Sequence, residues 1–146
     1  MEKGDVDVFV SMGGNFLSAT PDTRRTAKAI QRIGLTVQIS TKLNRSHLIT
    51  GQTALILPVL GRTELDKQQS GEQFVTVENS MGVVHQSKGK MKPVSDMLIS
   101  EPALVAQLGK RLCPDALNWG KFIENYDAIR DLMSLSLNGF EDYNRR

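Results

Sequence analysis

Cysteine and long apolar runs are scarce in this sequence, and each shortage excludes a class of protein. The 146 residues include one cysteine, Cys113, so neither an internal disulfide nor a multi-cysteine metal or iron–sulfur site can form within the chain. No apolar run approaches the roughly 20 residues that span a bilayer. Residues 1–5 also lack the charged-then-apolar layout of a secretion signal. We therefore expect a cytoplasmic location and no membrane partner.

The sequence also lacks a large excess of charge of either sign. The formal net charge is only +2, and the lysines and arginines are scattered among the acids, so nucleic acid is not an expected partner. No Gly-x-Ser-x-Gly motif is present to position a nucleophilic serine. The only histidines, His47 and His85, lack neighbouring acids at metal-ligand spacing. Both are open to a structural interpretation, although His47 lies closer to the expected ligand. The sequence therefore predicts no catalytic residue and no metal ligand in this chain.

What the sequence does contain is an apolar run that ends in glycines. Residues 5–11 predict a strand buried on both faces, and Gly-Gly-Asn follows it at residues 13–15. Glycines at the end of a strand let phosphate oxygens approach main-chain N–H groups, and the positive end of the next helix favours an anion. That helix is predicted to begin at Pro21, with Thr20 as its cap, and to end at Gly34. Because a third glycine is missing at the usual spacing, the pattern predicts a ligand loop without identifying the ligand.

The order of the predicted elements indicates an α/β fold. Further strands are predicted at residues 35–39 and 54–57, so that the first strand, the helix and the second strand form a right-handed parallel βαβ unit. We expect a three-layer Rossmann-like domain with a mainly parallel sheet, helices on both faces and a C-terminal helical pair. The expected regions of this single domain, 1–146, are a βαβ nucleotide-binding half at 1–60, a loop and hairpin excursion at 61–99, helices at 100–137 and an interdomain tail at 138–146.

Apolar periodicity predicts the C-terminal part of the chain in more detail. The strand-like residues 74–77 and 83–85 flank a turn and fit either a hairpin or an irregular extended excursion. Ser100 is the predicted cap of a first helix. An apolar stripe from Trp119 to Met133 predicts a second, continuous helix whose aromatic residues belong to the core.

Polar side chains follow two of the predicted strands, at the edge where α/β sheets bind ligands. Ser40, Thr41 and Lys42 come after the second strand and suit a ribose or a phosphate, and ordinary loop polarity explains them equally well. Glu64 and Asp66 come after the third strand. A ligand contact or an acid–base role is open for both carboxylates, and a solvated loop face is the commoner explanation.

Five segments, in the same order, resemble the molybdopterin oxidoreductases and most closely the formate dehydrogenase alpha-subunit-like branch. The first, Val8 to Phe16, is similar to the family's apolar strand followed by Gly-Glu-Asn-Pro or Gly-Glu-Asp-Pro. The fourth, Gly71 to Ser80, is similar to its Glu-Gly-Thr-Phe-Thr-Asn-x-Glu stretch. The other segments are 35–39, 54–58 with Glu64 beyond it, and 101–112.

The resemblance implies that this chain is a fragment of a larger multidomain oxidoreductase and is inactive by itself. In that family the region is a Rossmann-like domain that holds the guanosine end of one of two molybdopterin guanine dinucleotides. Molybdenum or tungsten would be ligated outside this chain, by earlier domains of the same polypeptide. The remaining domains are therefore the expected partners, and the sequence identifies neither the electron acceptor nor the substrate.

The resemblance also assigns cofactor contacts to two loops and one helix start. The loop that would touch the phosphates and ribose, with its nearby hydroxyls, comprises Gly13, Gly14, Asn15, Ser18 and Thr20. The contacts after the second strand are Gln38, Ser40, Thr41 and Lys42. Glu101 stands where the family has an aspartate and would accept hydrogen bonds from guanine, whereas stabilisation of a first helical turn is its ordinary role. Phe16 stands where the family has a proline. Ile39 or Ser40 stands where the family often has the acid that contacts the ribose.

Two other functions stay open on the sequence. The first is a free-standing enzyme that binds NAD or a flavin, in which case the isolated chain would bind that nucleotide. The incomplete glycine pattern counts against this function. A non-catalytic interaction domain would use the glycines only for a tight turn. Substitution of Gly13 or Glu101 would then leave the cofactor content of the complete polypeptide unchanged.

Overall fold

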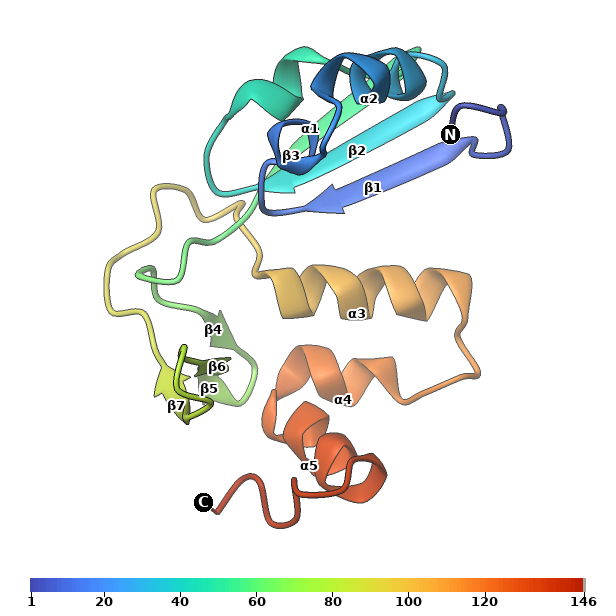
Figure 1. The fold of residues 1–146 in the computed structure, drawn as a ribbon. Coiled ribbons are helices and arrows are strands. Elements are labelled where there is room, and N and C mark those ends of the chain that lie inside the picture. The colour runs from blue at the N-terminus through green and yellow to red at the C-terminus, as the bar shows by residue number, and fades with distance from the viewer. Residues whose placement is uncertain (146) are drawn as a thin grey trace. The chain divides into compact units, whose positions relative to one another are not determined.

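The computed structural model describes residues 1–145. Contacts within the chain divide it into two compact units, unit 1 at Met1–Val59 and unit 2 at Leu60–Arg146. The chain is predicted to be one domain with an internal boundary at residue 60, and the two units divide after Val59. Each unit has its own strands and helices (Figure 1).

Unit 1 is built on a three-stranded parallel sheet with the order β1–β2–β3. Its strands are β1 (Val8–Met12), β2 (Leu35–Ser40) and β3 (Thr53–Pro58). Its helical segments are α1 (Phe16–Ala19), α2 (Thr23–Ile30) and the 3-10 helix η1 (Arg45–Leu48). The three predicted strands and the parallel pairing of the first two are therefore confirmed.

The helical segments of unit 1 cover one face of this sheet. Figure 1 shows α1 and α2 on the same side of the strands. On that side, the ring of Phe9 in β1 packs against the ring of Phe16 in α1, with the centroids 5.0 Å apart. The buried Gln38 of β2 donates from Nε2 to the Ser46 carbonyl of η1 over 2.9 Å. The core of unit 1 lies between these helical segments and the sheet.

The opposite face of the sheet carries no helix from unit 1 (Figure 1), so helices on both faces are not found within this unit. The strands pair in the order in which they occur, and right-handed crossovers that always step in the same direction lie on the same face. A Rossmann-like double winding needs the strand order to reverse, and residues 1–59 contain no such reversal. The side chains on this face are apolar, and Val8, Val10 and Leu55 are 53%, 49% and 47% exposed.

The long helix of unit 1 begins later than the sequence predicts. α2 starts at Thr23, and its cap is Asp22, whose Oδ1 accepts a hydrogen bond from the Arg25 N–H over 2.9 Å. Thr20, the predicted cap, instead follows α1 and donates its hydroxyl to the Leu17 carbonyl over 3.0 Å. The prediction fails because the residues after the glycines form a short helix of their own. The glycine turn therefore leads into the four-residue α1 and not into the long helix.

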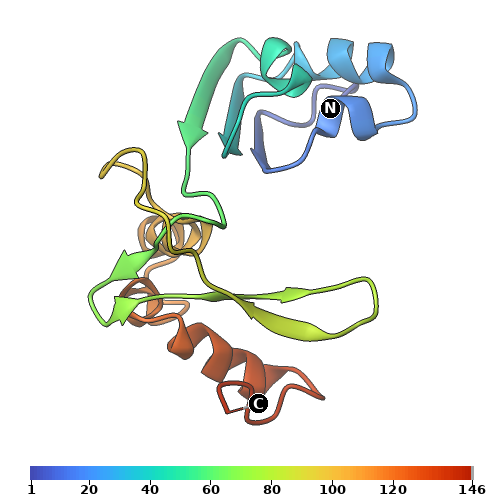
Figure 2. The ribbon, with the colours of Figure 1, turned by 90° about the vertical axis from the view of Figure 1, so that its left-hand side faces the viewer.

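Unit 2 combines two small antiparallel sheets with three helices. The predicted hairpin is confirmed by the pairing of β6 (Val75–Glu78) with β7 (Val84–Ser87), which Figure 2 shows as an extended ribbon. A shorter pair, β4 (Lys67–Gln68) and β5 (Gly71–Glu72), lies within the segment predicted as loop and hairpin. The helices are α3 (Glu101–Leu112), α4 (Trp119–Glu124) and α5 (Asp127–Ser136).

The helix α3 begins where the sequence predicts. Ser100 is its cap, and the Ser100 Oγ accepts a hydrogen bond from the Ala103 N–H over 3.4 Å. Gly109 of α3 lies against the ring of Trp119 in α4, where a Cβ would be 2.7 Å from ring carbons. Glycine at position 109 therefore allows the close packing of α3 on α4, at some cost in helix propensity.

The expected second helix is broken, so the predicted C-terminal pair is three helices. α4 ends at Glu124, and α5 begins at Asp127 after Tyr126. Tyr126 is 2% exposed, and its N–H donates to the Gln73 Oε1 over 2.9 Å. A continuous helix would need that N–H for its own hydrogen-bond ladder, so the contacts of Tyr126 interrupt the helix. Among residues 1–145, no helix has the length and apolar character needed to cross a membrane.

Candidate functional site

The turn after β1 is made by two glycines in a conformation that other residues rarely adopt. Gly13 has a φ of +64° and Gly14 a φ of +67°, both in the left-handed region. A Cβ at either position would meet no heavy atom within 4 Å. Glycine is therefore required here by the backbone conformation and not by crowding. The main chain of the turn borders open space, as the approach of a ligand requires.

Only part of the main chain of this turn is available to a ligand. The Gly13 N–H donates to the Ile39 carbonyl of β2 over 2.8 Å. The N–H groups of Gly14 and Asn15 have no acceptor among residues 1–145. The sequence does not distinguish the two glycines, whereas the structure leaves the N–H groups of Gly14 and Asn15 as the candidate donors to an anion.

Polar side chains from the segment after β2 hold the glycine turn in place. Asn44 donates from Nδ2 to the Gly14 carbonyl oxygen over 2.7 Å. Ser46 donates from Oγ to the Asn15 Oδ1 over 2.7 Å. The chain after β1 is thus tied to the chain after β2 at the carboxyl edge of the sheet, where α/β proteins bind ligands. Asn44 and Ser46 are not among the residues predicted for the site, although an asparagine before a short helix is a typical cap.

The predicted contact residues after β2 divide into two groups. Thr41 and Lys42 are exposed, and Ser40 is half-buried at the end of the strand. These three residues lie at the same edge as the glycine turn. Gln38 is 6% exposed, and its Nε2 is already bonded within unit 1.

The two hydroxyls predicted to assist the glycine turn differ in the same way. Ser18 lies in α1 and is exposed. Thr20 is half-buried, and besides its bond to the Leu17 carbonyl its Oγ1 accepts a hydrogen bond from the Thr26 Oγ1 over 2.8 Å. The Thr20 hydroxyl is therefore engaged in holding α1 and α2, whereas Ser18 faces solvent.

His47 is buried beside the glycine turn and makes a structural contact. Its side chain is 9% exposed, and its Nδ1 accepts a hydrogen bond from the Asn44 N–H over 3.0 Å. The Nε2 is buried and has no hydrogen-bond partner among residues 1–145. His85, by contrast, lies exposed on β7.

A small cavity lies between the sheet and the helical segments of unit 1. Its lining includes Phe9, Ser11 and Gln38, and its volume is about 10 Å³, which is room for about one water molecule. This cavity is too small for a nucleotide. Within residues 1–145, no group of three or more histidine, cysteine, aspartate and glutamate side chains is placed to hold a metal ion.

Two candidate carboxylates of unit 2 occupy different environments. Glu101 is the first residue of α3 and is half-buried, and its predicted contact with guanine stays a prediction. Glu64 accepts hydrogen bonds from the Gly61 N–H over 2.7 Å and from the Val94 N–H over 3.0 Å. Glu64 therefore joins two loop segments. The commoner explanation from the sequence, a side chain on a solvated loop face, does not account for these bonds.

Asp66 belongs to a polar centre around the buried Tyr126. The Tyr126 hydroxyl donates to the Asp66 Oδ2 over 2.7 Å, accepts from the Gln68 Nε2 over 3.2 Å and contacts the Ser100 Oγ closely. Burial raises the pKa of the Tyr126 hydroxyl above its usual value, and the Asp66 carboxylate raises it further. The hydroxyl thus stays protonated and joins the start of α3 to the segment around β4.

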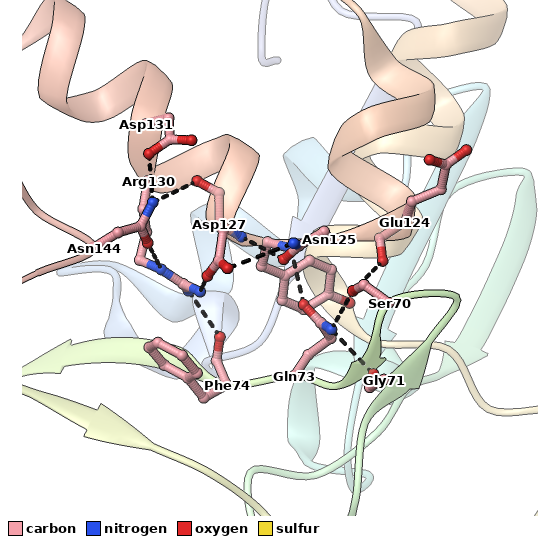
Figure 3. A network of polar contacts seen from close by, with 11 residues as sticks. Ser70, Gly71, Gln73, Phe74, Glu124, Asn125, Asp127, Arg130, Asp131 and Asn144 are labelled. Carbon is pink, nitrogen blue, oxygen red and sulfur yellow. Dashed lines mark hydrogen bonds and ion pairs between the residues drawn. The ribbon is translucent and has the colours of Figure 1, made fainter.

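A second polar cluster joins α5 to the segment between β5 and β6 (Figure 3). Arg130 is 5% exposed and donates from Nη1 to the Phe74 carbonyl over 3.1 Å, with its guanidinium carbon 3.8 Å from the centroid of the Phe74 ring. It also pairs with Asp127 and donates from Nε to the Asn144 Oδ1 over 2.6 Å. The segment predicted as an interdomain tail therefore packs on α5 through Asn144.

Similar chains occur in proteins named as oxidoreductases. The chain is 49% identical over 148 residues to "Uncharacterized oxidoreductase Rv2900c" of Mycobacterium tuberculosis (strain ATCC 25618 / H37Rv), a match that covers 100% of this chain and 19% of that protein. The protein named "Uncharacterized oxidoreductase Mb2924c" of Mycobacterium bovis gives the same identity and coverage. "Protein YdeP" of Escherichia coli (strain K12) is 44% identical over 144 residues, which cover 98% of this chain and 19% of YdeP.

The relatives are much longer than this chain, which spans 19% of their length. Because the matches cover nearly all of this chain, units 1 and 2 both belong to the shared region. No family model matches the chain, and no solved structure matches it. The names of the mycobacterial relatives give the reaction class and mention neither molybdopterin nor formate.

Proposed function

We propose that this chain is part of a larger oxidoreductase and that unit 1 holds the guanine nucleotide end of a molybdopterin guanine dinucleotide. The observation that carries the proposal is the left-handed Gly13-Gly14 turn, with open space around it, at the carboxyl edge of a parallel sheet. The names of the mycobacterial relatives, at 49% identity, support the redox class. The order of the five resembling segments supports this cofactor over other nucleotides.

The residues at this edge fit a nucleoside diphosphate. The N–H groups of Gly14 and Asn15 have no acceptor among residues 1–145, and without a Cβ at Gly14 a phosphate oxygen can approach closely. Lys42 is exposed on the loop after β2 and adds a formal positive charge. Ser40 and Thr41 add hydroxyls that can bond to a ribose.

Two of the predicted contact residues fit a supporting role better. The Gln38 Nε2 is bonded to the Ser46 carbonyl, and the Thr20 hydroxyl is bonded to the Leu17 carbonyl. Using either group for the cofactor would break a bond that holds the site. We therefore assign the cofactor contacts of unit 1 to residues 13–15 and 40–42 and place Gln38 and Thr20 in support of them.

The cofactor, when bound, supplies the redox chemistry through a molybdenum or tungsten ion ligated outside this chain. The residues of this chain bind and orient its nucleotide end, and none of them is assigned a catalytic role. The remaining domains of the same polypeptide are the proposed partners, since they would hold the reactive end of the cofactor.

Calorimetric titration of the 146-residue chain with GDP, NAD and FMN tests this proposal. We expect GDP to bind with a dissociation constant on the order of 1 mM, because most contacts of the complete cofactor are missing. The same titration with Gly14→Val is expected to show no binding, because a β-branched side chain cannot keep the left-handed turn.

The outcomes separate the three candidate functions. Binding of GDP that depends on Gly14 supports the proposal. Binding of NAD or FMN at least about a hundredfold tighter than GDP, a difference of about 2.7 kcal/mol, would replace it with a free-standing nucleotide enzyme. Binding of no nucleotide up to about 10 mM would contradict the proposal and favour an interaction domain.

A further inference from the structure

We propose that Asn44 is a positioning residue that turns the Asn15 N–H toward the phosphate of the bound nucleotide, an inference that rests on the proposed function of unit 1. Asn44 is 30 positions away from Gly14 in the sequence, and its Nδ2 donates to the Gly14 carbonyl oxygen over 2.7 Å. No prediction from the sequence assigns a role to Asn44. Its contact fixes the peptide group that joins Gly14 to Asn15.

Because a peptide group is planar, the contact that fixes the Gly14 carbonyl also orients the Asn15 N–H. The peptide bonds of the described residues are trans, and in a planar trans peptide the C=O and N–H groups point in opposite directions. Because Asn44 holds the Gly14 carbonyl, the Asn15 N–H points away from the Asn44 side chain. That N–H has no acceptor among residues 1–145, so it is oriented before any ligand binds.

The Met12–Gly13 peptide group, two before the one that Asn44 holds, is fixed in a different way. The Gly13 N–H donates to the Ile39 carbonyl over 2.8 Å and continues the ladder between β1 and β2. Serving a phosphate would cost that bond. The left-handed conformation of Gly13 and Gly14 reverses the chain between a peptide anchored to β2 and a peptide anchored to Asn44. Of the two unbonded donors, Gly14 and Asn15, only the Asn15 N–H belongs to the peptide group that Asn44 holds.

Short hydrogen bonds hold Asn44 itself in place. Its Oδ1 accepts from the Ser46 N–H over 2.9 Å, and its own N–H donates to the His47 Nδ1 over 3.0 Å. Ser46 in turn donates from Oγ to the Asn15 side chain. The cap of η1 thus orders the turn in advance, so that little conformational freedom is lost when a ligand binds. This also gives the buried His47 a function, since it orients the Asn44 main chain.

Two substitutions of Asn44 separate the loss of its Nδ2 donor from the effects of an added charge and of a smaller side chain. Asn44→Asp keeps the oxygen that accepts from the Ser46 N–H and loses the Nδ2 donor. Asn44→Ala removes the donor without adding a negative charge near the phosphate. Asn118→Asp is the matched control, because Asn118 caps α4 in unit 2 by accepting from the Lys121 N–H, which aspartate also does.

Amide NMR of the ¹⁵N-labelled chain during titration with GDP measures the effect residue by residue. We expect the Asn15 amide signal to move and its hydrogen exchange to slow, while the bonded Gly13 amide changes little. Both Asn44 variants are expected to weaken GDP binding roughly tenfold, as the loss of one oriented hydrogen bond to a charged group predicts. They are also expected to abolish the Asn15 shift, whereas Asn118→Asp leaves both unchanged.

The possible results distinguish this inference from the proposed function. Binding of GDP at the glycine turn without a change at Asn15, or with equal affinity in Asn44→Ala, would overturn the role of Asn44 and leave the nucleotide site standing. The absence of any shift with GDP would overturn both. If the variants do not fold, the wild-type chain still decides, because unchanged fast exchange of the Asn15 amide at saturating GDP contradicts the inference.

Discussion

Units 1 and 2 both contain networks in which side chains bond to the main chain. The network of unit 1 holds an exposed turn, whereas the network of unit 2 holds buried contacts between helices and strand segments. In unit 1, Asn44 and Ser46 hold an exposed glycine turn that keeps two N–H groups unbonded. In unit 2, Tyr126 and Arg130 are 2% and 5% exposed and join helices to strand segments. Substitutions in unit 2 should therefore change stability, whereas substitutions at the turn of unit 1 should chiefly change ligand binding.

The largest loss of stability is expected from Arg130→Ala in unit 2. The change removes the bond to the Phe74 carbonyl and the contact with its ring, and it leaves Asp127 and Asn144 without this partner. We expect a loss of about 3 kcal/mol in the free energy of unfolding, at the lower end for a buried pair because Asp127 is half exposed. Urea unfolding measures this loss.

Arg25→Ala is the matched control, because Arg25 pairs with Glu2 at the surface and is 69% exposed. Its urea midpoint should match that of the wild-type chain. Similar losses for the two arginine variants would show that burial does not set the importance of the unit 2 network.

Tyr126→Phe should cost about 1–3 kcal/mol at neutral pH, because it leaves buried partners of the hydroxyl unpaired. Burial raises the pKa of Tyr126 in the folded chain above the ordinary value of 10.0. Its contribution is therefore fully present below pH 10 and is lost as the pH rises further, where the unfolded chain releases the proton first.

Unfolding followed from pH 8 to pH 11 tests the sign of this effect. The wild-type chain and Tyr143→Phe should lose stability above pH 10 more steeply than Tyr126→Phe. Parallel curves for all three proteins would contradict the buried position of the Tyr126 hydroxyl.

In unit 1, Gly14→Ala should affect binding more than folding. A Cβ in the left-handed conformation costs about 1–2 kcal/mol, and it would point into the open space that the nucleotide needs. GDP binding should become undetectable by calorimetry. Gly82→Ala, in the turn between β6 and β7 with a φ of +75°, should lose similar stability and leave GDP binding intact. Equal loss of GDP binding in both variants would remove the distinction between the units.

The smallest effect is expected from Lys42→Ala. Removing an exposed ammonium should weaken GDP binding by about 1 kcal/mol, or roughly fivefold, with no change in the urea midpoint. The weakening should shrink at high salt, because exposed charges are screened. Lys28→Ala is the control, because Lys28 is an exposed lysine in the last turn of α2. An equal effect of both variants would indicate only a general influence of net charge.

The parts of the structure that depend on local residue patterns could be predicted from the sequence. The continuous apolar character of Leu55 to Leu57 is visible in the sequence, and so is the cap formed by Ser100. The helices on one face of the sheet were not predictable, because the face depends on strand order. The break before α5 depends on Gln73, which is 53 positions from Tyr126.

The same limit applies to the candidate site. The glycine turn could be predicted from the local sequence, since few other residues tolerate a left-handed conformation. The bond from Asn44 to Gly14 joins distant parts of the sequence, so no local pattern of apolar and polar residues predicts it. Gln38 was assigned to the ligand because it lies near the end of a strand, whereas the side-chain alternation of β2 places it beneath η1.

The most direct test of the central claim is the guanine nucleotide content of the longer polypeptide that we propose contains this chain. Hydrolysis of the purified protein, followed by quantification of the released GMP, should give GMP from the wild type and from Gly82→Val. The Gly14→Val protein, recovered in equally folded form, should give only the background level. Absence of GMP from the wild type, or undiminished GMP in Gly14→Val, would contradict the claim that the glycine turn of unit 1 holds the nucleotide end of the cofactor.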